Sequence, residues 1–427
     1  MGRRIAFISE HASPLAALGG ADAGGQNVYV GEVARQLSLK GYQIDIFTRR
    51  DEHELPKVVA FSEQIRIIHV DAGPAADIPK EELLQYMPAF TNDVLHFISS
   101  EQLSYELVHA NFFMSALVAM ELKKTLGIPF VVTFHALGHI RRIHQGDNDR
   151  FPKERIAIEE QAVREASMII AECPQDRDDL INYYDAQVEK ITIIPCGVNT
   201  AEFYPVNKSV ARSLLQLPAD ERILLQLGRM VPRKGVDTVI TALAAVRCSD
   251  APVKLLIVGG DIDTASELQR LRELAAELGL SDKISFLGQK SREELKYYYA
   301  AADLFITTPW YEPFGITPLE AMACGTPVIG SNVGGVRFSV ADGHTGALVP
   351  PKDPVALAAK ITSLLRSPAR LKEMSVNAVR RINKLFTWEL VAQDIQSLYE
   401  KVIGSGVVYP EKTASAQMIT YEKSNLH

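Results

Sequence analysis

The sequence predicts an α/β protein made of two doubly wound domains, each with a parallel sheet, that face each other across a central cleft. The chain has 427 residues, more than one hydrophobic core usually supports, so two domains of about 200 residues are expected. Short apolar runs rich in β-branched residues alternate with amphipathic helical segments, and such spacing indicates crossover connections between parallel strands. The pattern breaks at residues 203–213 and then restarts, which places one sheet on each side of this break.

The individual strands are predicted from short apolar runs that are bounded by turn or helix signals. In the first domain they are expected at residues 5–9, 44–48, 65–70, 107–110, 130–134, 168–171 and 191–195. In the second domain they are expected at residues 222–229, 254–259, 284–287, 304–307, 328–330 and 346–349. Because ligands of open α/β sheets lie beyond the carboxyl ends of the strands, we expect the functional site in the cleft between the domains.

Composition and charge indicate which kinds of binding partner and which cellular compartment to expect. The net charge is −7 and the pI is about 5.9, which argues against nucleic-acid binding. The first residues read as a strand rather than a signal peptide, and no apolar run approaches a membrane span. The four cysteines lack the spacing of a zinc site or a disulfide framework, so we expect buried thiols and a cytoplasmic protein. They are Cys173, Cys196, Cys248 and Cys324.

Two carboxylates, Glu312 and Glu320, flank a predicted loop-to-helix junction. Phe314 and Gly315 stand where the helix would open, and the unpaired N–H groups of a helix start favour an anion. The carboxylates can accept hydrogen bonds from neutral hydroxyls, so the segment suits a phosphorylated sugar. The same pattern would also fit an ordinary loop with a capping glutamate.

The first predicted strand leads into a glycine-rich loop that contains Gly19, Gly20, Gly24 and Gly25, and a helix follows. Glycines permit close backbone approach and leave N–H groups for a diphosphate or an anionic sugar. The loop is neither Gly-x-Gly-x-x-Gly nor a P-loop, so a dinucleotide fingerprint is not supported. A flexible strand-to-helix turn is the alternative reading.

A cluster of basic residues follows the first predicted strand of the second domain. Arg229, Arg233 and Lys234 all fall within one predicted turn. Arginine can bind two phosphate oxygens at once and lysine acts as a point charge, so Arg229 and Lys234 suit the diphosphate of a leaving nucleotide. A solvated charge run is the alternative, which the preceding apolar strand disfavours.

The first domain supplies the remaining candidates. His135 follows a predicted strand, where an imidazole can reach a sugar hydroxyl, although a single histidine is more often structural. Several cations lie in predicted loops of the same domain, and two or more that converge could hold an acceptor phosphate. These cations are Lys80, Arg141, Arg142 and Arg155. Each of them taken alone is more often an ordinary exposed cation.

These motifs occur in the order found in one enzyme family. The sequence resembles, over nearly its whole length, the retaining glycosyltransferases of the sucrose synthase, sucrose-phosphate synthase and glycogen synthase type, which belong to family 4. This resemblance implies a GT-B fold with two Rossmann-like domains. It also implies transfer of a hexosyl unit from a nucleotide sugar to a sugar phosphate, without a metal or any cofactor.

The resemblance assigns roles to the residues that match. The implied catalytic residues are His135, Arg229, Lys234 and Glu312. The implied donor-binding residues are Gly24, Gly25, Arg229, Lys234, Glu312, Phe314, Gly315 and Glu320. The implied acceptor-binding residues are Gln26, Lys80, Arg141, Arg142 and Arg155. The implied domains are an acceptor domain at 1–205, a donor domain at 206–386, a helix returning to the first domain at 387–411 and a polar tail at 412–427.

Within this family the segments around residues 24–26 and 135–138 are most similar to sucrose-phosphate synthases. That similarity implies transfer of glucose from UDP-glucose or ADP-glucose to fructose 6-phosphate, giving sucrose 6-phosphate. The region 73–90 and the segment around Arg155 instead resemble the inositol-phosphate N-acetylglucosaminyltransferases of mycothiol synthesis. However, Phe112 and Ala136 stand where a tyrosine and a threonine would be expected in those enzymes.

Two alternatives of other classes stay open. A noncatalytic nucleotide-sugar-binding protein would keep the binding residues without releasing nucleotide diphosphate. A phosphorylase-like enzyme would need a lysine that holds pyridoxal phosphate, and no late lysine has a suitable setting. The late lysines are Lys360, Lys372 and Lys384.

Overall fold

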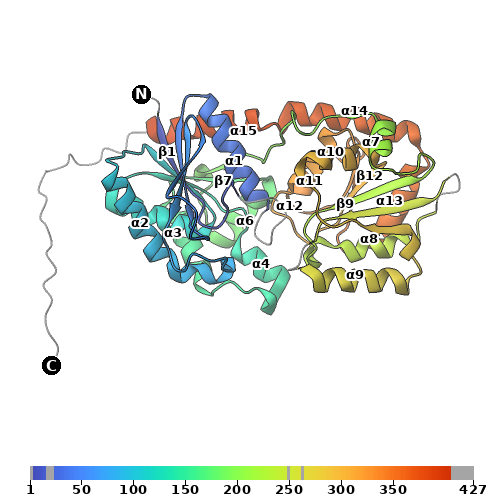
Figure 1. Ribbon diagram of the computed structural model, residues 1–427, viewed down its shortest axis with the longest axis horizontal. Helices are drawn as coiled ribbons and strands as arrows, with labels where there is room; N and C mark the ends of the chain where they lie inside the picture. Colours follow the sequence, from blue (N-terminus) through green and yellow to red (C-terminus); the bar gives the residue numbers. More distant parts are fainter. Residues whose placement is uncertain (1–2, 16–23, 248–250, 261–263, 405–427) are drawn as a thin grey trace, which may run out of the picture.

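Two sheets form the framework of the protein in this computed structural model, which describes residues 3–15, 24–247, 251–260 and 264–404 (Figure 1). The first sheet has eight strands in the order β3-β4-β2-β1-β5-β6-β7-β8, and the second has six in the order β11-β10-β9-β12-β13-β14. The predicted architecture of two doubly wound α/β domains is therefore confirmed.

The element bounds follow the apolar runs closely. The strands of the first sheet are β1 Arg4–Ile8, β2 Gln43–Arg49, β3 Val58–Ser62, β4 Ile65–Val70, β5 Leu107–Asn111, β6 Phe130–Thr133, β7 Met168–Ala171 and β8 Ile191–Ile193. The strands of the second sheet are β9 Arg222–Leu227, β10 Val253–Val258, β11 Ile284–Phe286, β12 Leu304–Thr307, β13 Val328–Ser331 and β14 Gly346–Val349.

Helices connect these strands and cover both faces of each sheet. The helices of the first half are α1 Gly25–Leu39, α2 Met87–Ser100, α3 Phe113–Leu126, α4 Gly138–Gln145, α5 Glu154–Glu165 and α6 Pro174–Tyr184. Those of the second half are α7 Lys208–Leu214, α8 Val236–Leu243, α9 Ala265–Glu277, α10 Arg292–Ala301, α11 Ile316–Ala323, α12 Gly334–Ser339, α13 Pro354–Leu365, α14 Pro368–Leu385 and α15 Trp388–Gly404. Short 3₁₀ turns are η1 Lys80–Tyr86, η2 Gly146–Asn148, η3 Val188–Lys190, η4 Pro232–Lys234 and η6 Ser281–Lys283.

Both faces of the strands are buried, as parallel sheets require. In β1, Ile5 and Phe7 belong to the core that includes α1 and α15, whereas Ala6 and Ile8 belong to the core that includes α2 and α3. In the second domain, α8 and α9 cover one face of the sheet and α10, α11 and α14 cover the other (Figure 1). This burial explains why the strands read as continuous apolar runs.

One strand was missed and is not parallel. Strand β3 pairs antiparallel with β4 at the edge of the first sheet, with a register shift between Ala60 and Ser62. Its residues alternate between exposed and half-buried, because successive side chains point to opposite faces of the sheet and only one of these faces is covered here. Five residues with this weak pattern do not stand out from a loop, so the expectation of a purely parallel sheet was wrong at this edge.

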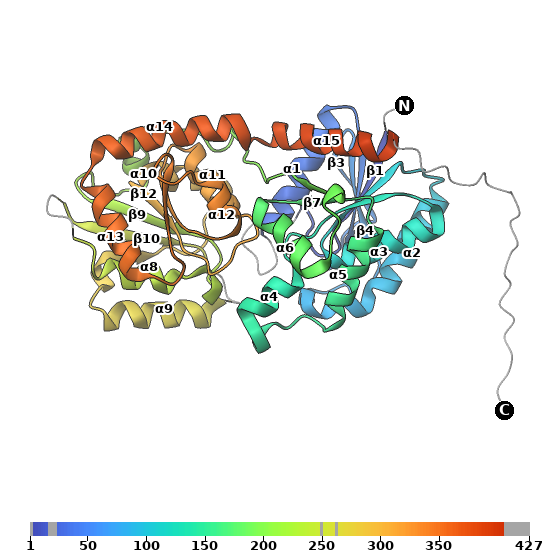
Figure 2. The same cartoon turned by 180° about the vertical axis from the view of Figure 1, so that it is seen from behind.

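The chain crosses between the two sheets twice, at adjacent places. The first crossing runs from β8 to α7, and the second joins α14 to α15, which lie one after the other along the same side of the molecule (Figure 2). The backbone N–H of Val198 donates to the carbonyl oxygen of Phe386 at 2.8 Å. At Gly197 a Cβ would lie 2.7 Å from the backbone nitrogen of Trp388, so only glycine permits this approach.

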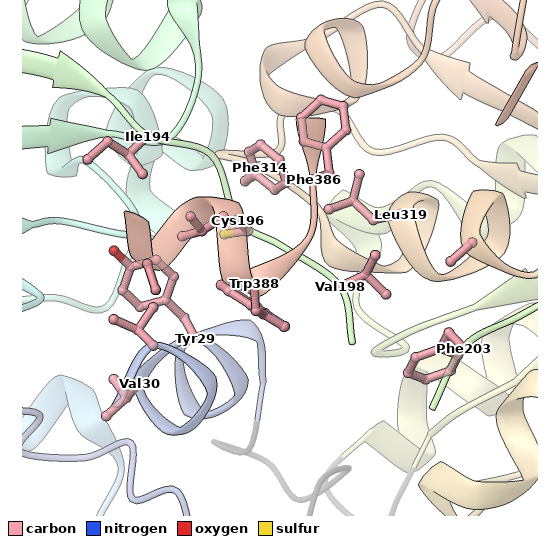
Figure 3. Packing of buried hydrophobic residues seen from close by; sticks show 14 of the residues in the cluster. Tyr29, Val30, Ile194, Cys196, Val198, Phe203, Phe314, Leu319, Phe386 and Trp388 are labelled. Atoms are coloured by element: carbon pink, nitrogen blue, oxygen red, sulfur yellow. The ribbon is translucent and has the colours of Figure 1, made fainter. Parts of the chain in front are cut away.

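Trp388 fills the space between the two crossings and is 2% exposed. Its indole packs edge-on against Tyr29 of α1, with ring centroids 5.9 Å apart. Figure 3 shows it among residues that come from α1, from the first crossing and from the second domain. One apolar core thus continues from one domain into the other through the crossings.

Helix α15 is fastened to the first sheet by a buried histidine. His109 in the middle of β5 is fully buried, and its Nδ1 lies 2.7 Å from the hydroxyl of Tyr399 while its Nε2 lies 2.9 Å from Oγ1 of Thr133. Burial lowers the pKa of His109 to about 3, and the neighbouring His135 adds to the shift. The folded protein therefore holds this imidazole neutral.

This arrangement predicts acid destabilisation. The unfolded chain protonates His109 below about pH 6.5 and the folded chain does not, so stability falls as the pH drops below that value, by about 2 kcal/mol at pH 5. We expect this component in urea unfolding of the wild type between pH 7.5 and pH 5, and we expect it to be lost in His109→Gln. The exposed His96 provides the control His96→Gln; an equal pH dependence in both variants would contradict the assignment.

No helix in the described part of the chain is long and apolar enough to cross a membrane. Cys173, Cys196 and Cys324 are buried, as expected. Gly19, Gly20, Cys248 and the predicted tail 412–427 lie outside the described residues, as do residues 405–411 of the predicted last helix.

Candidate active site

A cavity of about 390 Å³ lies between the carboxyl ends of the two sheets. From the first domain it is lined by the predicted residues Gly24, Gly25, Gln26, Lys80, His135 and Arg141. From the second domain it is lined by Arg229, Lys234, Glu312, Phe314, Gly315 and Glu320. The structure thus brings together twelve of the fourteen predicted site residues. The other two, Arg142 and Arg155, do not line the cavity.

On the second-domain side, Lys234 and Glu312 form an ion pair. Lys234 ends the turn η4, and Gly235 follows with a φ of +66°; a Cβ there would lie 2.1 Å from the carbonyl oxygen of Thr308. This close approach holds the cationic turn against the end of β12. A second cation, Arg233, lies 3.7 Å from the same carboxylate oxygen.

The two partners of this ion pair influence each other's ionisation. Burial opposes ionisation of Glu312, but the Lys234 ammonium and the Arg233 guanidinium outweigh it and hold the pKa of this carboxyl below its ordinary value. Burial also lowers the pKa of Lys234, and Glu312 offsets part of that effect. The cavity wall therefore presents a charged pair whose ammonium can be shared with an incoming anion.

The second carboxylate is held differently. Glu320 lies within α11, where it accepts a hydrogen bond from the hydroxyl of Tyr299 at 2.8 Å and one from Arg292 at 3.4 Å. Burial raises the pKa of Glu320, although Arg292 and Tyr299 offset part of the shift. A carboxylate has about four acceptor sites, so Glu320 can still accept from hydroxyls of a ligand. Arg292, which also lines the cavity, was missed because it opens a helix like any surface arginine.

The start of α11 forms the wall between these carboxylates. Gly315 is the N-cap residue with a φ of +91°, and the first N–H groups of the helix have no intrahelical partner. The side chain of Phe314 is 3% exposed and packs in the core with Phe386. Phe314 can therefore contribute its backbone to the site, while its ring anchors the loop.

On the first-domain side, Gln26 and Arg141 are fixed by their neighbours. The amide of Gln26 donates to the carbonyl oxygen of Asn111 at 3.1 Å. Arg141 pairs with the half-buried Asp149 at 3.0 Å and stacks on Phe151, with its guanidinium carbon 4.8 Å from the ring centroid. Lys80 at the start of η1 lines the same wall. Two of the predicted cations therefore line this wall, and their binding of an acceptor phosphate stays a prediction.

The remaining predicted cations lie elsewhere. Arg142 donates to the backbone carbonyl of Lys153 at 3.3 Å, away from the cavity. Arg155 is 1% exposed, pairs with the buried Glu159 at 2.7 Å and lies among three phenyl rings at 4.5 to 4.9 Å. Neither residue lines the cavity, which corrects the expectation of direct acceptor contact. The side chain of Arg155 is sealed behind aromatic rings, and that of Arg142 is engaged by the backbone of Lys153.

His135 lies in the cavity wall with both ring nitrogens near protein acceptors. Its Nδ1 is 3.1 Å from Oε1 of Glu172, and its Nε2 is 3.1 Å from Oδ1 of Asn111. Glu172 lines the cavity too. Sequence reasoning missed these partners, although Glu172 directly follows β7 and Asn111 ends β5, which puts both at the carboxyl edge where ligands bind.

The two domains also touch beside the cavity. The ring of His144 in α4 stacks on Tyr311, with centroids 4.7 Å apart and planes at 15°. The side chain of Gln145 donates to the hydroxyl of Tyr311. Since Tyr311 immediately precedes Glu312, this contact links α4 to the loop that carries the carboxylate. Among the described residues, no group of three or more acidic, histidine or cysteine side chains is arranged to hold a metal ion.

Comparisons with known proteins agree with the two-domain fold. Residues 23–202 match the family model for Glycosyltransferase Family 4, and residues 208–381 match that for Glycosyl transferases group 1. A D-inositol 3-phosphate glycosyltransferase from Thermobispora bispora is 36% identical over 410 residues, covering 94% of this chain and 95% of the relative. Another from Stackebrandtia nassauensis is 34% identical over 422 residues, covering 97% of this chain and 95% of the relative.

The sucrose-phosphate synthase of Thermosynechococcus elongatus is similar in structure. It has a TM-score of 0.88 and 36% sequence identity, covering 95% of this chain and 100% of the neighbour. The curated relatives and this neighbour thus carry two different names at similar identity. The match to the family confirms the coarse resemblance found in the motifs, and the finer assignment to sucrose-phosphate synthases stays a prediction.

Proposed function

The chain belongs to the group 1 and family 4 glycosyltransferases, and on this premise we propose that it transfers glucose from UDP-glucose or ADP-glucose to fructose 6-phosphate. The products are sucrose 6-phosphate and a nucleotide diphosphate, with retention at the anomeric carbon. Residues 1–205 bind the acceptor and residues 206–386 bind the donor. The enzyme works in the cytoplasm without a bound metal ion, so activity is expected to withstand EDTA.

One observation carries this proposal: the cavity has a separate set of cations on each side. Lys80 and Arg141 come from the first domain, and Arg229 and Lys234 come from the second. Two sets on opposite walls suit two anionic ligands, a donor diphosphate and an acceptor phosphate. A protein that binds only a nucleotide sugar would not need the cations of the first domain.

On the donor side, the cations act on the leaving group. Negative charge on the diphosphate grows as the bond to glucose breaks, so Arg229 and Lys234 bind the transition state more strongly than the ground state. Glu320 accepts from the ribose hydroxyls and Glu312 from the hydroxyls of the hexose. The carboxylate of Glu312 is engaged by Lys234, which suits hydrogen bonding rather than attack on carbon.

On the acceptor side, the phosphate lies against Gln26, Lys80 and Arg141, and His135 orients the sugar. The contact between His144 and Tyr311 joins the two walls beside the cavity. A cavity closed by contact between the two domains excludes water, which would otherwise hydrolyse the donor.

Transfer of N-acetylglucosamine to an inositol phosphate is the second candidate. It is favoured by the names of the curated relatives at 33–36% identity. It is disfavoured by Phe112 and Ala136, which line the cavity without hydroxyl groups. The ring of Phe112 packs against Phe151 and the Arg155 guanidinium, so this part of the wall is apolar.

The decisive experiment measures release of nucleotide diphosphate from UDP-glucose, ADP-glucose and UDP-N-acetylglucosamine, each with fructose 6-phosphate, inositol phosphate or no acceptor. Release from a glucose donor that depends on fructose 6-phosphate, with sucrose 6-phosphate as product, supports the proposal. Dependence on inositol phosphate replaces it with the second candidate. Binding of donor without release under any condition would indicate a noncatalytic protein.

The acceptor wall can be tested directly. Lys80→Ala and Arg141→Ala each remove a charge-assisted contact worth about 1.5–3 kcal/mol, so the KM for the sugar phosphate is expected to rise about 10- to 100-fold. The dissociation constant of the donor should stay the same. Arg142→Ala is the matched control because Arg142 does not line the cavity. An equal rise in KM for Arg142→Ala would contradict this placement.

A further inference from the structure

The backbone at His135 is held in an unusual conformation. His135 follows β6 with a φ of +56°, and the N–H of Ala136 donates to the carbonyl oxygen of Phe134 at 2.6 Å. A hydrogen bond between residues i and i+2 around a central residue with positive φ is a γ-turn of the strained kind. Strain of this kind persists only where the surroundings hold the residue in place, and it concentrates at functional sites.

Two polar side chains hold the ring of this residue from opposite sides. The side-chain amide nitrogen of Asn111 donates to the carbonyl oxygens of Ile8 at 3.4 Å and His109 at 3.3 Å. These two acceptors fix the amide so that its oxygen faces Nε2 of His135, 3.1 Å away. Nε2 therefore carries a hydrogen.

The other ring nitrogen faces Glu172. Oε1 of Glu172 lies 3.1 Å from Nδ1 of His135 and also accepts from the thiol of Cys196 at 3.1 Å. The side chains of His135 and Glu172 are 10% and 4% exposed. Two atoms that can both accept do not approach so closely in a buried site unless a proton lies between them. A proton is therefore shared by, or bound to one of, these two atoms.

We propose that Glu172 is a positioning residue for glycosyl transfer: with Asn111 opposite, it holds the His135 ring and keeps the strained turn in place at the cavity wall. The inference rests on the proposed function. It deepens that function by adding a residue that none of the motifs includes. Glu172 acts through His135 and need not touch either substrate.

The position of Glu172 in the chain connects this clamp to the donor wall. The next residue, Cys173, donates its thiol to the carbonyl oxygen of Pro313 at 3.4 Å, and Pro313 follows Glu312. The backbone N–H of Glu172 in turn donates to Asp176 at 3.0 Å. The backbone of Glu172 is thus held in place by Asp176, while its side chain reaches His135.

A double-mutant cycle on nucleotide diphosphate release tests the proposal, using whichever acceptor supports turnover. Glu172→Ala is expected to lower kcat about 10- to 100-fold, the range seen for carboxylates that orient metal-bound histidines, with little change in the KM of the donor. Glu172→Gln, which can still hydrogen bond to Nδ1, should recover most of the loss. In a His135→Ala background, Glu172→Ala should have no further effect. Additive losses, or full activity of Glu172→Ala, would overturn the proposal.

A second measurement does not depend on activity. The ring nitrogens of His135 can be observed by NMR in the free protein and assigned with His135→Gln. The wild type should show a hydrogen on Nε2, and Glu172→Ala should shift the ring signals while the control Asp178→Asn should not. Unchanged signals in Glu172→Ala would refute the clamp. If no acceptor supports turnover, the proposed function fails and this measurement still decides the role of Glu172.

Discussion

Replacing Lys234 by alanine is expected to lower kcat about 10²- to 10³-fold, the range found when one donor to a developing negative charge is removed. The ammonium of Lys234 lies at the cavity wall, paired with Glu312. Its loss leaves the charge of the departing diphosphate less well neutralised when that charge is largest. Initial rates of nucleotide diphosphate release at saturating donor and acceptor measure the effect.

A control must separate chemistry from folding, because Lys234→Ala leaves the carboxylate of Glu312, 11% exposed, beside Arg233 alone. Removing one partner of a buried pair costs about 3–5 kcal/mol. The double variant Lys234→Met with Glu312→Gln removes both charges and should recover stability in urea without recovering activity. Lys283→Ala, an exposed lysine on η6, should behave as the wild type. A folded double variant with nearly normal kcat would show that the lysine has no role in catalysis.

Arg155→Ala is expected to destabilise the protein by about 3–5 kcal/mol, since it leaves the fully buried Glu159 without its cation. Glu159 also accepts from the backbone N–H of Gly138 at 2.9 Å and from the hydroxyl of Tyr184. Its displacement would therefore disturb the start of α4, which carries Arg141 to the cavity. Urea unfolding monitored by fluorescence measures the loss.

The pair Arg155→Met with Glu159→Gln separates this structural role from acceptor binding. Methionine fills the space between the phenyl rings, and glutamine can still accept from Gly138 and Tyr184. The double variant should regain most of the lost stability and keep the KM of the acceptor. A stable double variant with a greatly raised acceptor KM would restore Arg155 to the acceptor site.

These two residues show what sequence patterns can predict. Lys234 follows an apolar strand at a turn, so its place at the carboxyl edge of the sheet follows from strand order alone. Arg155 is also a cation, but its burial depends on Phe112, Phe113 and Phe151, which come from other segments. The glutamate four residues after Arg155 was the available signal, since that spacing on a helix indicates an ion pair.

The fold itself was largely predictable because a parallel sheet buries both faces of its strands and so leaves a clear apolar run for each of them. One face of strand β3 is exposed, so the rule for strands buried on both faces does not apply to it. Glu172 and Asn111 were missed for another reason. Each is a single polar residue at a strand end, where helix caps and loop residues are equally common, and only the fold brings them to His135.

The return of α15 to the first domain has a consequence for biosynthesis. The face of α1 and the imidazole of His109 are covered by residues 388–404, which are made after the whole second domain. At 5–20 residues per second, the ribosome needs roughly 10–40 s to synthesise the intervening stretch. During that interval the first domain has its sheet but lacks its last covering helix. The nascent chain therefore presents an apolar surface that chaperones can bind, and the enzyme matures only when its final helix arrives.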